Sequence, residues 1–291
     1  MKTWRYDWYN LRAPAIPLIT IDPYFSVWSA TDELNASNTV HWTCKPNRIT
    51  GILAVDNVEY LFMGTRENTE KMVQTGCDIN TFSTVYTFKC EQANLKLTFT
   101  SPLLPNDLKI MSRPVSYMHA EVSTPENFTG RIELRLYVHD DICLDHPGES
   151  PTTGEHVNLD NAVCARMGNS IQNVLSKAGD DVRINWGYFY LAVNRKDAEI
   201  LVHSENGSTI LEARIPMGTV RNPDTLVLFA YDDIYSIQYY GKNLKGYWTL
   251  ESESVETIIR RAIAEYAAGQ QGFIYKVRLA CMVRIINAGK K

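Results

Sequence analysis

Eleven consecutive residues, HDDICLDHPGE at 139–149, bring two histidines, three aspartates, a glutamate and a cysteine close together. Carboxylates and imidazoles can bind a metal ion, or transfer protons as a general acid and base. The spacing matches no ligand pattern such as HExxH, and Pro-Gly near its end also suits an ordinary turn. A metal site, an acid–base pair and a solvated turn all stay open. The ionisable candidates are His139, Asp140, Asp141, Asp145, His146 and Glu149.

The residues before this segment identify the element that positions it. Across 131–138, apolar residues at 132, 134, 136 and 138 alternate with polar ones, which is typical of a half-buried antiparallel strand. The segment 139–149 therefore follows the end of a strand. We predict a polar, solvated strand-exit loop there, with metal binding as the less favoured interpretation.

Similar apolar or alternating runs recur along most of the chain. Residues typical of turns separate them, and Asp56-Asn57 predicts a two-residue hairpin turn. Many strands joined by short turns predict a mainly β protein, a large antiparallel β-sandwich followed by a C-terminal helix. The further predicted strands lie at 49–55, 58–63, 82–90, 95–100, 115–122, 187–193, 198–203, 209–215 and 225–231.

Helical spacing of apolar residues occurs in two places. One is 170–179, which ends at a glycine, and the other is 254–268, where the apolar stripe is longer. A helix with an apolar stripe needs a partner surface, and the basic segment after it supplies no evident one. We therefore divide the chain into a sandwich region, 1–250, and a helical segment, 251–291, which we interpret as the truncated start of a helical domain.

Charge and cysteine content exclude several classes of function. The formal net charge is −4, with lysines and arginines scattered singly, so we expect no nucleic-acid partner and no membrane partner. Neither an apolar run of about 20 residues nor the apolar core of a signal peptide is present, so localisation stays unassigned. Six cysteines without CxxC spacing predict buried free thiols and no zinc. They are Cys44, Cys77, Cys90, Cys143, Cys164 and Cys281. No P-loop or dinucleotide-binding motif occurs in the sequence, so we expect no cofactor.

Two pairs of adjacent aspartates, at 180–181 and 232–233, are further candidates for a general acid and base. Adjacent residues on a strand point to opposite faces, so neither pair forms an acid–base dyad by itself. Aromatic clusters such as PYFSVWS, HWT and IYSIQYYGKNLKGYW suit core filling, carbohydrate stacking or a domain interface. The interface candidates are Trp28, His41, Trp42, Tyr239 and Tyr240.

Long ordered blocks of the sequence resemble the glutaminase A-like family. They are RAPAIPLITIDPYFSVWSATDELNASNTVHWT (12–43), VEYLFMG (58–64), LTFTSPLLPNDLKIMSRPVSYM (97–118), LSKAGDDVRINWGYFYLA (175–192) and LFAYDDIYSIQYYGKNLKGYW (228–248). The resemblance spans about residues 12 to 266. Asn57 stands where the family usually has glycine, and the sequence after Gln270 diverges from the family. A truncated or frame-shifted product would give this result, as would a genuine stand-alone gene product.

The resemblance implies an N-terminal β-sandwich followed by a helical domain similar to the six-hairpin glycosidases. It also implies hydrolysis of glutamine to glutamate and ammonia, commonly after export, with the catalytic groups mainly in the helical domain. No catalytic residue, cofactor-binding residue or metal ligand is therefore carried over to this chain.

The leading hypothesis is a non-catalytic N-terminal sandwich module of a glutaminase A-like amidohydrolase, which supports the helical catalytic domain. A homo-oligomer through the C-terminal helix is a second candidate partnership. A carbohydrate-binding accessory module is the alternative function. A hydrolase that uses the acids of 139–149 with a metal is a third hypothesis.

Overall fold

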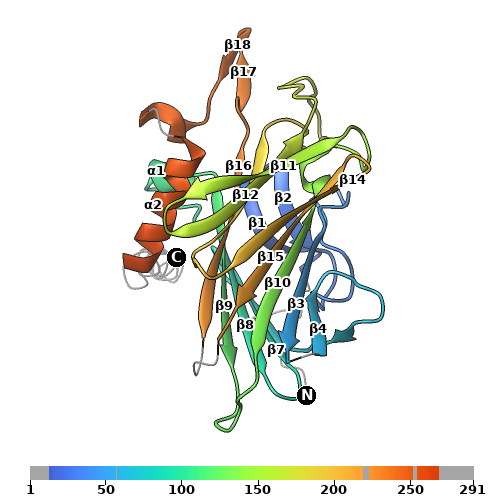
Figure 1. Cartoon of the computed structure of the whole chain (residues 1–291). Coiled ribbons are helices and arrows are strands. Elements are labelled where there is room, and N and C mark those ends of the chain that lie inside the picture. The colour runs from blue at the N-terminus through green and yellow to red at the C-terminus, as the bar shows by residue number, and fades with distance from the viewer. Residues whose placement is uncertain (1–12, 57, 219–222, 252–253, 269–291) are drawn as a thin grey trace, which may run out of the picture.

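The computed structural model describes residues 13–56, 58–218, 223–251 and 254–268. Two large sheets lie face to face in this part of the chain, and a C-terminal helix packs against one of them (Figure 1). The predicted fold class, a mainly β antiparallel sandwich followed by a helix, is confirmed. Of the strand pairs described, only β4 with β5 is parallel.

The first sheet has six strands in the order β14-β15-β10-β3-β4-β5. Their bounds are β14 Glu199–Glu205, β15 Ser208–Pro216, β10 Ile132–His139, β3 Ile49–Val55, β4 Val58–Met63 and β5 Glu70–Lys71. Val55 pairs with Val58 and Asp56 has a φ of 53°, in agreement with the predicted two-residue turn. Asn57 lies outside the described residues.

The second sheet has eight strands in the order β11-β12-β13-β16-β9-β8-β7-β6. Their bounds are β11 Thr152–Leu159, β12 Ala162–Asn169, β13 Tyr188–Val193, β16 Asp224–Asp232, β9 Val115–Ser123, β8 Asn94–Thr100, β7 Ser83–Lys89 and β6 Val73–Ile79. The remaining elements are the pair β1 Ile16–Asp22 and β2 Phe25–Ser29, the hairpin β17 Ile237–Tyr239 and β18 Lys242–Leu244, helices α1 Leu108–Met111 and α2 Val255–Ala268, and the 3-10 helices η1 Asp140–Cys143 and η2 Tyr247–Glu251.

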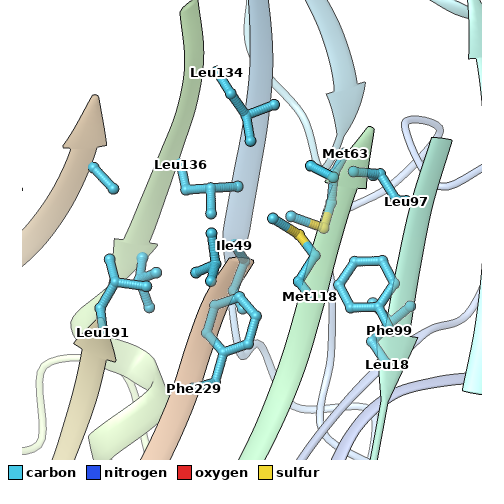
Figure 2. Close-up of a cluster of buried hydrophobic side chains, with 14 of the residues drawn as sticks. Leu18, Ile49, Met63, Leu97, Phe99, Met118, Leu134, Leu136, Leu191 and Phe229 are labelled. Carbon is cyan, nitrogen blue, oxygen red and sulfur yellow. The ribbon is translucent and has the colours of Figure 1, made fainter. Parts of the chain in front are cut away.

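The core lies between the two sheets. Figure 2 shows Leu134 and Leu136 of β10 and Ile49 of β3 beside Met118 and Phe229, which belong to the opposite sheet. All five side chains are at most 2% exposed. Burial of each such side chain stabilises the fold by about 1.5–3 kcal/mol, and β10 places every second residue inward, as its sequence predicted.

The apolar stripe of α2 has a partner, contrary to the expectation from the sequence. Val255, Ile258 and Ile259 pack with Leu228 on the outer face of the eight-stranded sheet, and all four are buried. Strand β16 is consequently buried on both faces. The stripe therefore gives no reason to invoke a second copy of the chain, although oligomerisation through α2 stays an untested prediction. The basic segment after residue 268 lies outside the described residues.

The predicted helix at 170–179 is wrong. The segment forms successive turns, in which Ile171 is 50% exposed and Leu175 has a φ of 54°. The side chain of Gln172 donates to the main-chain oxygen of Asn169 at 2.7 Å and accepts from the N–H of Gly187 at 2.5 Å. A ten-residue helix is marginal by itself, so these side-chain bonds determine the local structure.

Several strands were not predicted, because apolar and polar residues alternate too little along them. Edge strands β6 and β11 are largely exposed, and polar residues occupy both of their faces. Strands β1, β2 and β12 were also missed. Five cysteines are free thiols in the part described, while Cys281 falls outside it. No helix among the described residues has the length and apolar character needed to cross a membrane.

Candidate functional site

Segment 139–149 begins where β10 ends, as predicted, but its aspartates are not exposed to solvent. Asp140, Asp141 and Asp145 are only 7%, 1% and 4% exposed. The prediction of a solvated loop is therefore wrong for these three residues. His146 and Glu149 do lie on the surface.

Asp140 connects three elements at this end of the sandwich. Its Oδ2 accepts hydrogen bonds from Thr152 Oγ1 at 2.9 Å and from Ser208 Oγ at 2.8 Å. The main-chain N–H of Thr209 adds a third bond at 3.1 Å. The carboxylate therefore joins η1 to the first residues of β11 and β15, and its Oδ2 is fully used by protein donors.

The carboxylate of Asp141 accepts hydrogen bonds from Arg48, which directly precedes β3. The main-chain N–H of Arg48 donates to Oδ1 at 2.8 Å, and its Nε donates to Oδ2. Asp145 lies at the other end of the same turn and is also buried. Its carboxylate accepts hydrogen bonds from the main-chain N–H of Arg183 at 3.0 Å and from Lys177 Nζ at 2.9 Å. Both acids are thus held by cations from distant parts of the chain.

The pKa of Asp145 reflects these contacts. Burial by itself would raise this pKa, but the hydrogen bonds from Arg183 and Lys177 and the charges of Lys45 and His146 outweigh burial and lower it to about 2. The carboxylate therefore stays ionised well below neutral pH. A group with so low a pKa is a poor general base, because it gives up its proton too readily.

The guanidinium of Arg183 lies at the centre of the turn and is buried. Its Nε and Nη2 donate to the main-chain oxygen of Asp145, and Nη1 donates to Asn47 Oδ1 at 2.9 Å and to the main-chain oxygen of Asp141 at 3.1 Å. The sequence analysis did not single out Arg183. Its signal was indirect: three closely spaced aspartates have no Lys or Arg in their own segment, so a cation must come from elsewhere.

Glu149 completes the turn by binding its own main chain. It accepts from the N–H of Asp145 at 2.8 Å and of His146 at 3.2 Å, and from the side chain of Asn185. Among the described residues, no group of three or more His, Cys, Asp or Glu side chains could hold a metal ion. Segment 139–149 is therefore a buried polar network that joins strands, and it offers no ligand set for the metal-dependent hydrolysis considered above.

A second group of acids lies where β16 ends. Burial is the main cause that raises the pKa of Asp233, to about 6, and the neighbouring charges of Asp22 and Asp232 raise it further. Burial also raises the pKa of Asp22 and of Asp232. The side chain of Trp186 donates to the main-chain oxygen of Asp233 at 2.8 Å, which fixes the chain just before the β17–β18 hairpin.

The interface candidates differ in exposure. His41 is fully buried, and burial lowers its pKa to about 4, while its ring contacts Thr43 Oγ1 at 3.0 Å and the main-chain oxygen of Pro23 at 3.2 Å. Trp28 is half-buried and donates to Ser26 Oγ. Trp42 is 47% exposed.

Tyr239 and Tyr240 are 60% and 88% exposed and lie at the tip of the β17–β18 hairpin. The hairpin projects from one end of the sandwich (Figure 1), and all six of its strand residues are exposed. Positive φ values of 45° and 73° at Tyr240 and Gly241 form its two-residue turn. The two tyrosine rings meet edge to face, with centroids 4.5 Å apart and planes 73° apart.

A series of contacts joins the two sets of candidates. Trp42 Nε1 donates to the main-chain oxygen of Pro23 at 2.6 Å, and the next residue, Tyr24, packs against Trp186 with ring centroids 6.3 Å apart. Trp186 in turn binds Asp233, at the base of the hairpin. Trp42 and the hairpin therefore belong to the same end of the sandwich.

Comparisons with known proteins show a distant relationship between this chain and glutaminase A. Residues 6–74 match the family model "Domain of unknown function (DUF4964)", and residues 82–215 match "Domain of unknown function (DUF5127)". A stretch of 121 residues is 31% identical to "Glutaminase A" of Aspergillus oryzae (strain ATCC 42149 / RIB 40). This match covers 39% of the chain and 18% of the fungal protein.

Among solved structures, a "Putative kojibiose phosphorylase from human microbiome" is similar, with a TM-score of 0.41 and 9% sequence identity. The alignment covers 92% of this chain and 34% of that protein. The chain therefore spans about a fifth of the glutaminase and a third of the phosphorylase. Over the matched region, the chain is a distant relative of glutaminase A.

Proposed function

We propose that this chain is the N-terminal β-sandwich module of a glutaminase A-like amidohydrolase and supports a helical domain that hydrolyses glutamine. The 31% identity to glutaminase A over 121 residues supports the relationship. The acids of 139–149 support a non-catalytic role, because Asp140, Asp141 and Asp145 are bound by protein donors. A polar network of this kind holds strands together and leaves no free acid–base pair.

The proposal that the module contacts another domain rests on the projecting β17–β18 hairpin. Ile237, Tyr239, Tyr240 and Leu244 are 54%, 60%, 88% and 41% exposed on one short hairpin. Apolar side chains gathered in this way mark interaction surfaces, and tyrosine is enriched among residues that dominate binding. We assign this hairpin, together with Trp42 at the same end, as the surface for the helical domain.

Ammonia release from L-glutamine by the purified chain tests the non-catalytic role. We expect no release above the blank, and turnover would refute this part of the proposal. Binding is tested separately, by sedimentation velocity of the chain mixed with the separately produced helical domain of a glutaminase A-like protein. The double variant Tyr239→Ser/Tyr240→Ser is expected to weaken the complex at least about tenfold.

Val73→Ser is the matched control, because Val73 is 55% exposed on edge strand β6, outside the hairpin. This variant should bind as the natural chain does. Absence of a complex at about 100 μM, far weaker than a specific interface, would contradict the proposal. Equal weakening by both changes would contradict the assignment to the hairpin.

Carbohydrate binding is the competing function. The planes of Tyr239 and Tyr240 lie 73° apart, so the two rings do not form one flat stacking platform. Titration with a panel of soluble glycans separates the two functions. Saturable binding that is lost in Tyr239→Ser/Tyr240→Ser would favour the carbohydrate-binding module.

A further inference from the structure

Three half-buried carboxylates lie where the chain leaves the sandwich for the β17–β18 hairpin. Asp22 ends β1, Asp232 ends β16, and Asp233 is the first residue of the segment that leads into the hairpin. Asp22 Oδ1 accepts from the main-chain N–H of Tyr24 at 2.7 Å. Asp232 Oδ1 accepts from the main-chain N–H of Ile234 at 3.0 Å. No Lys, Arg or His of the described residues forms an ion pair with any of the three, so no cation is bound to this group.

Burial and like charges act together on Asp233. Burial is the main cause that raises its pKa, the charges of Asp22 and Asp232 raise it further, and a hydrogen bond with the Ser236 side chain opposes them. Charges on other elements act on Asp232, where one acid raises its pKa and two cations lower it; they are Glu256, Lys245 and Arg166. Ionisation of Asp233 therefore adds a negative charge to a half-buried group that already repels it.

The segment that joins Asp233 to the hairpin, residues 233–236, is short and constrained, and we call it the hairpin base. Ile234 has a φ of 59°, which a β-branched residue rarely adopts. The N–H of Tyr235 donates back to the main-chain oxygen of Asp233 at 2.5 Å. The N–H of Ser236 donates to the main-chain oxygen of Leu244 at 2.9 Å, which closes the hairpin. A strained conformation of this kind persists only while surrounding contacts hold it.

Trp186 is the contact that fastens the hairpin base to the sandwich. Its indole is buried, and its Nε1 donates to the main-chain oxygen of Asp233 at 2.8 Å and lies 3.4 Å from that of Tyr235. The Trp186 ring also packs against Tyr24, two residues after Asp22. Movement of Asp233 away from Asp22 would therefore break the bond between the hairpin base and the core.

We propose that the hairpin base is a pH-sensitive switch, which stays closed while Asp233 is protonated and opens more often once Asp233 is ionised. Repulsion from Asp22 and Asp232 and the cost of a half-buried charge both favour an open base in which the carboxylate reaches water. Closure of the base does not depend on glutamine hydrolysis. Its consequence for docking, a better ordered hairpin in acid, rests on the proposed function.

Hydrogen exchange of the full chain at pH 5.0 and 7.5, with each rate divided by the intrinsic rate at that pH, tests the switch. The pKa of Asp233 is about 6 in the closed base and 3.8 when the carboxyl is in water, so closure is favoured in acid and lost as pH rises. Linkage then makes opening about tenfold more frequent at pH 7.5 than at pH 5.0. We expect the protection of the amides of 236–244 to fall about tenfold, with β10 as the internal reference. Equal protection of 236–244 at the two pH values would overturn the proposal.

Three variants assign the effect to the carboxylates. Asp233→Asn cannot ionise, so protection of the hairpin should be the same at both pH values. Asp22→Asn removes one repelling charge and should reduce the difference below tenfold. Asp197→Asn is the matched control, because Asp197 lies outside the hairpin base and is bound by Arg195, and it should keep the full difference. Thermal melts establish that the variants fold. A tenfold difference that persists in Asp233→Asn, or one that Asp197→Asn abolishes as well, would refute the switch.

Discussion

Arg183 donates three hydrogen bonds to Asp145, one from its main chain and two from its guanidinium. The Nε and Nη2 atoms of Arg183 donate to the main-chain oxygen of Asp145 at 3.0 and 2.6 Å, and the main-chain N–H of Arg183 donates to the Asp145 carboxylate at 3.0 Å. The two residues are 38 positions apart in the sequence. Together they fasten the turn after β10 to the segment that leads into β13.

Replacement of Arg183 should be strongly destabilising. Arg183→Met keeps much of the side-chain length but removes the guanidinium that donates to the main-chain oxygens of Asp145 and Asp141. Breaking a buried charged network in this way costs about 3–5 kcal/mol, measurable by urea unfolding. Lys96→Met, at a surface pair with Glu121, should change stability by at most about 1 kcal/mol. A loss of similar size in the two variants would contradict the role assigned to Arg183.

Asp145 should make the fold sensitive to acid. Its pKa is lowered from 3.8 to about 2, so its ionised form stabilises the folded state above pH 4, and this contribution disappears as pH falls from about 4 to about 2. Asp145→Asn should be less stable than the natural chain at pH 7 and should lose less stability over that interval. Urea midpoints measured at pH 7, 4, 3 and 2 check the expectation. Parallel pH profiles would show that Asp145 is not responsible.

Asp233 should have the opposite pH dependence. Its pKa is raised from 3.8 to about 6, chiefly by burial, so the folded state favours the protonated form and loses this stabilisation as pH rises from about 4 to about 6. Asp233→Asn keeps a neutral polar group, and we expect it to melt higher than the natural chain at pH 8 with little difference at pH 4. A variant that melts lower than the natural chain at both pH values would contradict this account.

Gly187 is predicted to tolerate no side chain. Its φ is +80°, and an added Cβ would lie 2.0 Å from the main-chain oxygen of Asp232. We expect Gly187→Ala to cost at least about 2 kcal/mol, because a main-chain contact cannot yield as a side chain can. Gly148→Ala shares the positive φ, +71°, but has no atom within 4 Å, so it should cost about 1 kcal/mol. Chemical denaturation of both variants separates the clash from the backbone strain.

The sequence predicted the elements whose pattern is local. Strand β10 alternates inward aliphatic residues with outward, more polar ones, and helix α2 repeats apolar residues at helical spacing, so each was found from its own residues. The segment 170–179 has a helical pattern of the same kind, yet Gln172 binds Gly187, 15 residues away, and no helix forms. The prediction from periodicity was wrong there, because side-chain hydrogen bonds with another segment competed with a short helix.

The candidate site depended more on tertiary contacts. The sequence drew attention to His139 through Glu149 and to the aromatic residues. In the structure, Trp42, Tyr239 and Tyr240 are exposed and His41 is buried. Nothing in the local sequence distinguishes His41 from the adjacent Trp42. In the folded chain the buried imidazole ring contacts Thr43 Oγ1 and the main-chain oxygen of Pro23, and only the tertiary structure shows this environment.

By itself, the sequence determined a mainly β chain with a C-terminal helix, because strand and helix periodicities are properties of neighbouring residues. The tertiary structure alone decided that the three aspartates of HDDICLDHPGE belong to a buried network. The groups that offset the charge of Asp145 are the ammonium groups of Lys45 and Lys177 and the main-chain N–H of Arg183. They lie on either side of Asp145 in the chain, and only folding brings them together. Burial of a carboxylate becomes favourable when such donors converge on it, and convergence is a property of the fold.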